Sequence, residues 1–200
     1  MDFLSEGFFQ AFGLIFSGNE ETWTTVLITL KLTALSMAAT LVLGLPLGFL
    51  LGYFDFPGKR WVRMTVDTLL ALPTVVVGLL VYGLLSRQGA LGFLDLLYTP
   101  SAMVLAQAIL AFPLVAALVI AAVASQDARV HLTALTLGAS PWRARGVVLR
   151  EARLAVMAAF CAAFGRVLTE VGAAIMVGGN IRHYTRTITT AITLETAKGE

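Results

Sequence analysis

The chain has 200 residues, of which 58% are hydrophobic and 13% are charged, and its mean hydropathy is +0.85. A soluble globular domain is about one quarter charged, so this composition excludes an ordinary soluble domain and indicates an integral membrane protein. The net charge of +2 indicates no particular partner by itself, and the placement of the charges is more informative.

Residues 1–21 carry four acidic residues and no basic residue, so they lack the positively charged start of a signal peptide. Leu4, Phe8, Phe12 and Ile15 recur at helical spacing along this segment. Such a stripe predicts a short external helix that lies on the outer leaflet of the membrane.

Long apolar runs follow, and each is long enough for a membrane-spanning helix of about 20 residues. Three of the runs, 32–54, 68–86 and 96–126, contain no charged residue, and a fourth, 154–181, is interrupted only by Arg166 and Glu170. The sequence therefore predicts an all-α integral membrane bundle, a single transmembrane domain over residues 1–200. The four predicted spans cover residues 24–54, 66–86, 101–124 and 154–178.

The basic residues indicate the orientation. Eight Lys or Arg residues lie in the first and third connections, against four in the second connection and the C-terminal segment. Because basic residues stay on the cytoplasmic side, we expect loop 125–152 to be cytoplasmic, and both the N-terminus and residues 180–200 to be external. Residues 180–200 are too polar and too short to cross, so we expect the natural chain to continue into a fifth span.

The first span carries a small residue at every fourth position, which favours close packing against another helix. The stripe consists of Ser36, Thr40, Gly44, Gly48 and Gly52. Prolines inside the first three spans, Pro46, Pro73 and Pro113, are candidates for helix bending, because each frees a carbonyl of the preceding turn.

Loop 125–152 carries helix start and stop signals. Ser125 and Asp127 predict the start of a first short helix, and Gly138 predicts its end. Ser140 and Pro141 then predict the start of a second short helix. Three interpretations remain open: an anchor to anionic lipid headgroups, a nucleic-acid contact, which is the weakest, and a docking element for a soluble partner.

The stretch LTALTLGASPWRARGVVL, residues 132–149, resembles the cytoplasmic loop of bacterial ABC-importer permeases. Ala134 and Gly138 match the family pattern, whereas Leu132 stands where the family has Glu. The resemblance implies that this loop couples the membrane protein to a separate ATPase. The residues that it assigns to the coupling loop are Ala134, Gly138, Ala139, Ser140, Trp142 and Arg143.

The stretch GRVLTEVGAAIMVGGNI, residues 165–181, is similar to the segment that follows this loop in oxyanion permeases. With residues 184–199, it makes the chain most similar to tungstate permeases of the molybdate, sulfate and tungstate group. The resemblance implies a type I ABC-importer permease fold in the bacterial or archaeal cytoplasmic membrane. It also implies a homodimer with two copies of a cytoplasmic ATPase and an extracytoplasmic oxyanion-binding protein. ATP and Mg²⁺ would bind to the ATPase, and no cofactor to this chain.

Arg166 and Glu170 are four residues apart in the fourth predicted span, where an unpaired charge costs about 2.5–3.5 kcal/mol on insertion scales. We therefore expect them to form a pair on one helix face, directed at the protein interior. A structural clamp is favoured over a direct substrate contact, because a fixed arginine would hold a divalent oxyanion too tightly for release.

Other function classes are less well supported by the sequence. A stand-alone channel or secondary carrier is the main alternative, and a carrier would be expected to show broken helices in both halves, which the sequence does not reveal. A passive anchor does not explain the Arg166–Glu170 pair. His131 and His183 are far apart in sequence, so we expect no metal site, and no nucleophile–base pair or phosphate-binding glycine loop indicates an enzyme.

Overall fold

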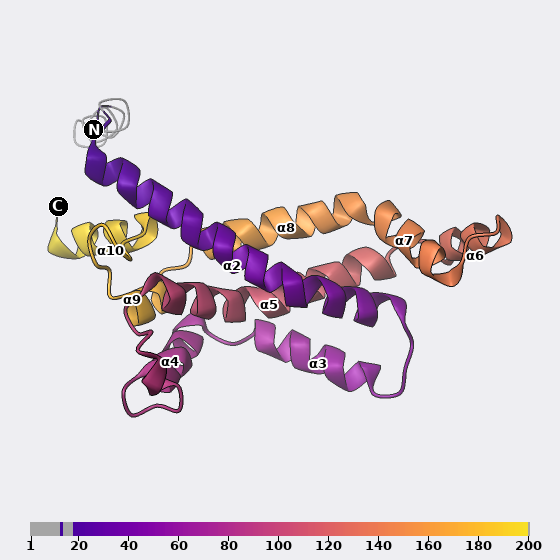
Figure 1. Cartoon of the computed structure of the whole chain (residues 1–200), viewed down its shortest axis with the longest axis horizontal. Helices are drawn as coiled ribbons and strands as arrows, with labels where there is room; N and C mark the ends of the chain where they lie inside the picture. Colours follow the sequence, from indigo (N-terminus) through magenta and orange to yellow (C-terminus); the bar gives the residue numbers. More distant parts are fainter. Residues whose placement is uncertain (1–12, 14–17, 200) are drawn as a thin grey trace.

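The computed structural model describes residue 13 and residues 18–199. Within this part of the chain, helices are the only regular secondary structure, and turns and short loops join them. Figure 1 shows an elongated arrangement in which most helices run along the long axis. The helices, in chain order, are α2 (Glu20–Tyr53), α3 (Lys59–Leu70), α4 (Thr74–Leu85), the 3₁₀ helix η1 (Gly92–Leu94), α5 (Pro100–Ala124), α6 (Ala128–Thr136), α7 (Pro141–Glu151), α8 (Arg153–Leu168), α9 (Gly172–Gly178) and α10 (Ile188–Lys198).

The centre of the bundle is the contact between α2 and α5, which run in the same direction. A Cβ placed on Gly48 would lie 2.6 Å from Cβ of Val119 and 2.9 Å from the carbonyl oxygen of Ala116. Gly44 and Gly52 approach α5 in the same way, one turn before and one turn after. The predicted packing role of the small-residue stripe is confirmed, because the two backbones come too close for larger side chains.

Two of the predicted spans are each divided into two helices. The axes of α3 and α4 differ by 97°, and those of α8 and α9 by 57°. Among the described residues, α2 and α5 are long and apolar enough to cross a membrane, and the number rises to four if each bent pair forms one span. The sequence predicted one span over 66–86, with a candidate bend at Pro73, and one over 154–178; the break in the second was not predicted.

The prolines account for only one of the two breaks. Pro73 is the N-cap residue of α4 and lies at the sharper bend, as predicted. Pro46 and Pro113 lie inside α2 and α5, and both helices continue as α-helix through them. Neither therefore breaks its helix, and Pro113 is buried in the bundle.

The two helices that follow the breaks, α4 and α9, pack against each other. A Cβ on Gly78 of α4 would lie 2.8 Å from Cα of Ala173 of α9, and a Cβ on Gly172 would lie 3.1 Å from Val75. Val77, Val81, Ala173 and other buried residues of α4, α5 and α9 form one hydrophobic cluster. The breaks thus bring two short helices into one contact that straight spans would not make.

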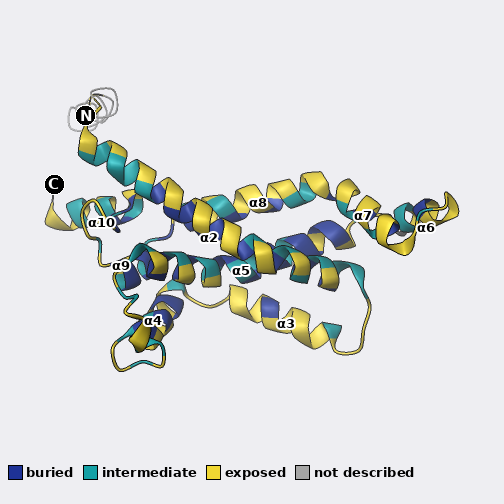
Figure 2. Cartoon of the chain, viewed as in Figure 1, coloured by how far each residue is buried: buried dark blue, intermediate teal, exposed yellow. Residues whose placement is uncertain are grey.

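Helices α6 and α7 lie at the opposite end of the long axis from α10 and the start of α2 (Figure 1). Figure 2 shows that buried residues concentrate along α2, α5 and α9, while α3 and the loop helices are largely exposed. The separation fits a protein with one cytoplasmic and one external end.

Two predicted helix starts differ from the structure. The external helix predicted over residues 1–21 falls mostly outside the described residues, and its last two residues, Glu20 and Glu21, form the first turn of α2. Ser125 does not start α6: it is the C-cap residue of α5, and its hydroxyl donates to the carbonyl oxygen of Ala122. Asp127 is the N-cap residue instead and accepts from the backbone N–H of Arg129 at 2.8 Å.

Candidate functional site

Gly138 fixes the angle between the two loop helices. Its φ is +86°, and the backbone N–H groups of Gly138 and Ala139 donate to the carbonyl oxygens of Leu135 and Ala134. This pair of bonds is the Schellman arrangement, which ends a helix with a left-handed residue. A Cβ on Gly138 would meet nothing within 4 Å, so the requirement for glycine comes from the backbone conformation and not from space.

The second loop helix begins as the sequence predicts. Ser140 accepts from the backbone N–H of Arg143 at 3.4 Å, and Pro141 occupies the first turn, where its missing N–H costs nothing. The capped start and the left-handed glycine hold α6 and α7 in one fixed relation.

The predicted coupling residues divide into a buried and an exposed set. Ala134 is buried, so it contributes to packing within the loop and offers no surface to a partner. Trp142 is 78% exposed, Leu137 is 82% exposed, and Arg143 is exposed. The loop therefore presents two large apolar side chains and a guanidinium group at the tip of the molecule.

Contacts to the end of α2 support the loop, and the sequence did not predict them. The guanidinium of Arg145 lies 5.0 Å from the ring centre of Phe54 and 4.8 Å from that of Trp142. The hydroxyl of Tyr53 lies 2.8 Å from Nδ1 of His131, whose ring packs edge-on against the tyrosine. These contacts transmit the position of α2 to the loop, because they join its last residues to α6 and α7. Spacing within the loop carries no signal for contacts that depend on a distant helix.

Arg166 and Glu170 form the predicted pair, with Nη1 of Arg166 3.0 Å from Oε2 of Glu170. The pair is not on one continuous helix face, because α8 ends at Leu168 and Glu170 lies in the break before α9. Glu170 is 5% exposed and lies in the protein interior, whereas the Arg166 side chain is 51% exposed in the single chain. The orientation of the arginine toward the interior of the assembly stays a prediction.

Glu170 also holds the break together. Its Oε1 accepts from the backbone N–H of Ala173 at 3.2 Å, and its backbone carbonyl accepts from the hydroxyl of Thr189 at 3.0 Å. One carboxylate thus joins the end of α8 to the start of α9, and its backbone joins the break to α10. These bonds support the structural-clamp interpretation of the pair.

A cavity of about 160 Å³ lies where the two helix breaks approach α5. Arg166, Glu170, Gln107 and Thr74 contribute its polar side chains, and apolar residues of the α3–α4 break, α5 and α8 line the rest. Gln107 is buried and accepts from the hydroxyl of Ser36 at 2.7 Å, so α2 is joined to this cavity as well. The half-exposed arginine is therefore next to the two positions at which the spans bend.

A profile of the family described as "Binding-protein-dependent transport system inner membrane component" matches residues 44–196. The chain belongs to this family. The match includes both broken spans and the whole of the α6–α7 loop. The chain is therefore a multi-pass membrane permease subunit of an ABC transporter, and permease subunits of this kind are not catalytic.

Two relatives that match the whole chain are named as tungstate uptake system permeases. The chain is 42% identical over 200 residues to the tungstate uptake system permease protein TupB of Campylobacter jejuni, and the match covers 100% of the chain and 84% of the relative. It is 34% identical over 200 residues to TupB of Peptoclostridium acidaminophilum, with 100% and 88% covered. The molybdenum transport system permease protein ModB of Escherichia coli is 32% identical over 188 residues, with 89% and 82% covered.

Family membership and the structure together correct one argument from the sequence. Broken helices in both halves were expected of a secondary carrier and were not seen in the sequence, yet this ABC permease has two broken spans. Broken spans therefore do not separate the two classes. The break at Thr169–Val171 contains no proline, and its only local signal is the charged Glu170 followed by Gly172.

Proposed function

We propose that this chain is the pore-forming subunit of an ATP-driven importer for a tetrahedral oxyanion, with tungstate as the first candidate and molybdate or sulfate next. The observation that carries the proposal is the similarity, over the whole chain, to two tungstate uptake permeases. The similarity to molybdenum permeases supports the wider oxyanion class.

The family name implies a transport system with an external binding protein, and ABC permeases act with a separate ATPase. We propose a homodimer of this chain with two copies of the ATPase, which would hold ATP and Mg²⁺. An extracytoplasmic oxyanion-binding protein would deliver the substrate. Selectivity would then reside mainly in the binding protein, and the pore would need only weak affinity for the anion.

Loop 125–152 is the proposed coupling element, with Gly138, Ala139, Ser140, Trp142 and Arg143 in the docking region. The loop projects from one end of the bundle and exposes Trp142 and Leu137. Large exposed apolar side chains on a rigid turn favour a protein partner. A lipid anchor requires basic residues but does not require a fixed angle between two short helices.

We further propose four spans in this chain, with each bent pair counted as one span and with the N-terminus outside. The charge distribution supports this topology, and the placement of the loop at the opposite end from α10 and the start of α2 agrees with it. Labelling of single cysteines in intact cells, in a Cys161→Ser background, tests it. Reaction of a cysteine at position 143 with an impermeant reagent would reverse the orientation.

The structure suggests how ATP could drive the transport cycle. When the ATPase dimer closes, the docked loop would move with it, and the contacts of Arg145 and His131 would carry the movement to the end of α2. The breaks at Pro73 and Glu170 would absorb the movement by bending, because few backbone hydrogen bonds cross them. Alternating access would result from a change of these two bend angles around the cavity.

The test of coupling compares two glycines of the same loop. Gly138→Val places a branched side chain at φ +86°, at a cost of about 1–2 kcal/mol, and rotates α7 relative to α6. Gly146→Val adds the same side chain within α7, where a Cβ meets nothing within 4 Å. We expect Gly138→Val to insert normally but to lose ATPase co-purification and ATP-dependent tungstate uptake, and Gly146→Val to keep both.

Normal uptake by Gly138→Val would mean that the loop is a lipid anchor and not the coupling element. A wild-type permease that purifies without any ATPase, and transports without ATP, would instead support a stand-alone carrier. Uptake is measured in proteoliposomes, with the binding protein on the side of the membrane that corresponds to the cell exterior.

A further inference from the structure

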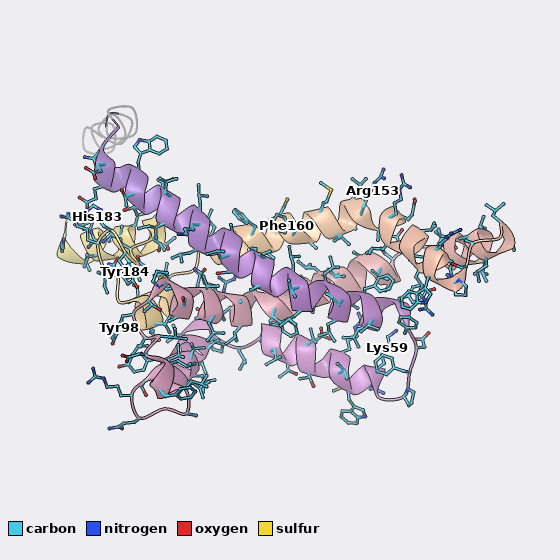
Figure 3. The ribbon with its side chains drawn as sticks, viewed as in Figure 1. Lys59, Tyr98, Arg153, Phe160, His183 and Tyr184 are labelled. Atoms are coloured by element: carbon cyan, nitrogen blue, oxygen red, sulfur yellow. The ribbon has the colours of Figure 1, made fainter. Side chains whose placement is uncertain are left out.

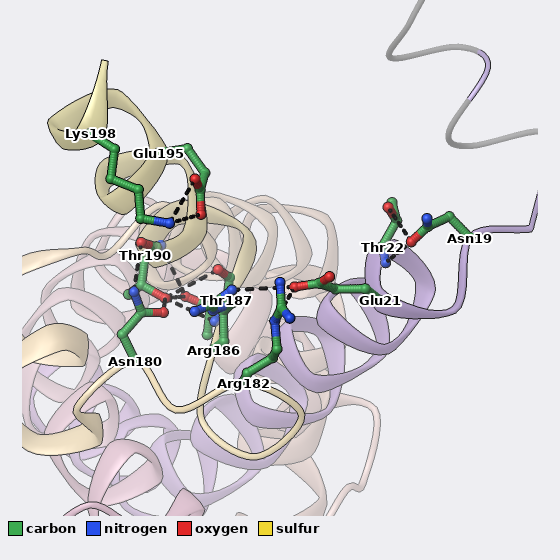
Figure 4. Close-up of polar contacts among 10 residues, drawn as sticks. All are labelled: Asn19, Glu21, Thr22, Asn180, Arg182, Arg186, Thr187, Thr190, Glu195 and Lys198. Carbon is green, nitrogen blue, oxygen red and sulfur yellow. Dashed lines mark hydrogen bonds and ion pairs between the residues drawn. The ribbon is translucent and has the colours of Figure 1, made fainter. Parts of the chain in front are cut away.

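Two arginines converge on one carboxylate at the end of the molecule opposite the coupling loop. Nε of Arg182 lies 2.6 Å from Oε1 of Glu21, and Nη1 of Arg186 lies 3.3 Å from the same oxygen (Figure 4). The arginines belong to the segment between α9 and α10, whereas Glu21 belongs to the first turn of α2. Figure 3 labels His183 and Tyr184 of the same segment at this end.

Buried threonines hold this segment in one conformation. The hydroxyl of Thr185 accepts from the backbone N–H of Ile181 and donates to the carbonyl oxygen of Gly178. Thr187 and Thr190 form a reciprocal cap at the start of α10, and Thr190 also bonds the side chain of Asn180. The two arginine side chains therefore start from fixed backbone positions, which lowers the entropy cost of placing both on one ligand.

Positive charge and donor groups exceed the available acceptors in this cluster. Among the charged residues that line this region, three cations, Arg182, Arg186 and Lys198, face two carboxylates, Glu21 and Glu195, so one positive charge is in excess. Arg186 is only 13% exposed, and its buried Nε has no hydrogen-bond partner among the described residues. A buried donor without an acceptor is costly, and a ligand oxygen would satisfy it.

Space for such a ligand lies beside the arginines. A cavity of about 630 Å³ is lined by Glu21, Arg182, Arg186, Glu195 and Lys198, together with neutral residues of α2 and α10. The fork geometry of guanidinium groups suits a tetrahedral oxyanion, whose several oxygens accept parallel hydrogen bonds. The cavity is open, so an anion could enter it without any opening of the bundle.

We propose that Arg182 and Arg186 form an external receiving site for a tetrahedral divalent oxyanion, and that Glu21 is a built-in competitor which occupies the arginines until the anion displaces it. The inference rests on the proposed import function. The competing carboxylate keeps the affinity low, so the site passes the anion on and does not retain it. The alternative is a clamp in which the three side chains only fasten α2 to the 181–187 segment.

Glu21→Gln separates the two interpretations, because they predict opposite results. If the receiving site is correct, removal of the competing charge lowers the tungstate concentration at half-saturation about fivefold. A fivefold change corresponds to the upper end of the free energy of a partly exposed ion pair. The clamp predicts a lower unfolding midpoint and an unchanged half-saturation. Glu21→Asp, which keeps the charge on a shorter side chain, gives a smaller decrease and remains informative if Glu21→Gln does not fold.

The assay uses the purified permease–ATPase complex without nucleotide or binding protein. Sodium tungstate is titrated at constant ionic strength, and heat of binding or the thermal midpoint gives the half-saturation. We expect Arg186→Gln to raise the tungstate concentration at half-saturation at least tenfold, because the charged guanidinium group with its several N–H donors is lost. Arg186→Lys, which keeps the charge, should raise this concentration less. Arg87→Gln is the matched control: it removes an exposed arginine outside the cluster and should leave the value unchanged.

An unchanged or higher half-saturation in Glu21→Gln overturns the receiving site, as does an equal loss of binding in Arg87→Gln, which would indicate a general charge effect. Uptake into proteoliposomes with ATP and binding protein is measured in parallel. If the wild type imports tungstate but Glu21→Gln does not bind it more tightly, only this inference fails. If tungstate binding depends on Arg186 but no oxyanion is imported, the anion site stands and the proposed function fails.

Discussion

At the α10 end of the molecule, polar side chains are buried and hydrogen bonded to one another, whereas at the α6–α7 end large apolar side chains are exposed. Thr185 and Thr190 are fully buried and each has more than one partner, while Trp142 and Leu137 extend outward without a cover. Buried polar networks fix one conformation, and exposed apolar groups favour association. The first end is thus built to hold its shape, and the second to bind.

The largest difference between the two ends should appear in matched threonine variants. Thr185→Val removes a hydroxyl that bonds both Ile181 and Gly178, so it leaves the buried carbonyl of Gly178 and the partly buried N–H of Ile181 without this partner. We expect a loss of about 2–4 kcal/mol in the free energy of unfolding. Thr136→Val removes an exposed hydroxyl of α6 and should change the free energy of unfolding by less than about 0.5 kcal/mol.

Thermal unfolding of the detergent-solubilised variants measures the difference. The comparison between the ends fails if the two substitutions shift the midpoint equally. A Thr185→Ser variant, which keeps the hydroxyl, is the control and should recover most of the stability.

A smaller effect is expected at the Arg166–Glu170 pair, which lies between the two ends. Arg166→Leu leaves the buried carboxylate of Glu170 without its cation, and we expect a loss of about 2 kcal/mol, less than for a fully buried pair because the arginine is half-exposed. Arg166→Leu combined with Glu170→Gln should be more stable than the single variant, since the amide oxygen can still accept from Ala173.

The unfolding midpoints of the wild type, the single variant and the double variant test this order. A double variant as unstable as the single one would show that the pair does not act as a unit. A role for Arg166 in the substrate pathway would then gain support over the clamp.

The smallest effect is expected within the loop itself. Arg145→Met removes the guanidinium that lies against Phe54 and Trp142, a contact of about 0.5–1 kcal/mol. Hydrogen exchange of the α7 amides should become a few times faster. Arg143→Met, two residues away and exposed, should leave exchange unchanged but weaken ATPase binding if the loop docks as proposed. Faster exchange in Arg143→Met would mean that the residue stabilises the loop.

Local signals predicted the ends of the loop helices and the close packing of α2. Gly138, Ser140 and Pro141 act through bonds to residues within five positions, so their conformation follows from the sequence around them. The stripe from Ser36 to Gly52 repeats every fourth residue, and that period alone places it on one helix face. Asp127 as the true cap of α6, in place of Ser125, shows that such signals leave boundaries uncertain by one or two residues.

Hydrophobicity did not predict the two broken spans, because a bent helix pair and a straight helix need the same apolar composition. Prolines were also insufficient: Pro73 lies at a break, while Pro46 and Pro113 lie within continuous helices, where neighbouring groups compensate for the missing hydrogen bond. The break at Glu170 depends on contacts with Ala173 and Thr189, which come together only when α9 and α10 fold back onto the bundle.

Resemblance to known permeases indicated the family. The sequence by itself determined that this is a helical membrane protein with a two-helix loop turned at Gly138. These properties depend on composition, helical period and short-range bonds, which each segment carries alone. Only the tertiary structure decided that Arg166 is half-exposed beside a cavity, that Arg145 lies against Phe54, and that Arg182 and Arg186 meet Glu21. These features involve residues of separate elements or depend on where a helix ends. They are set by the packing of the whole bundle and not by any one segment.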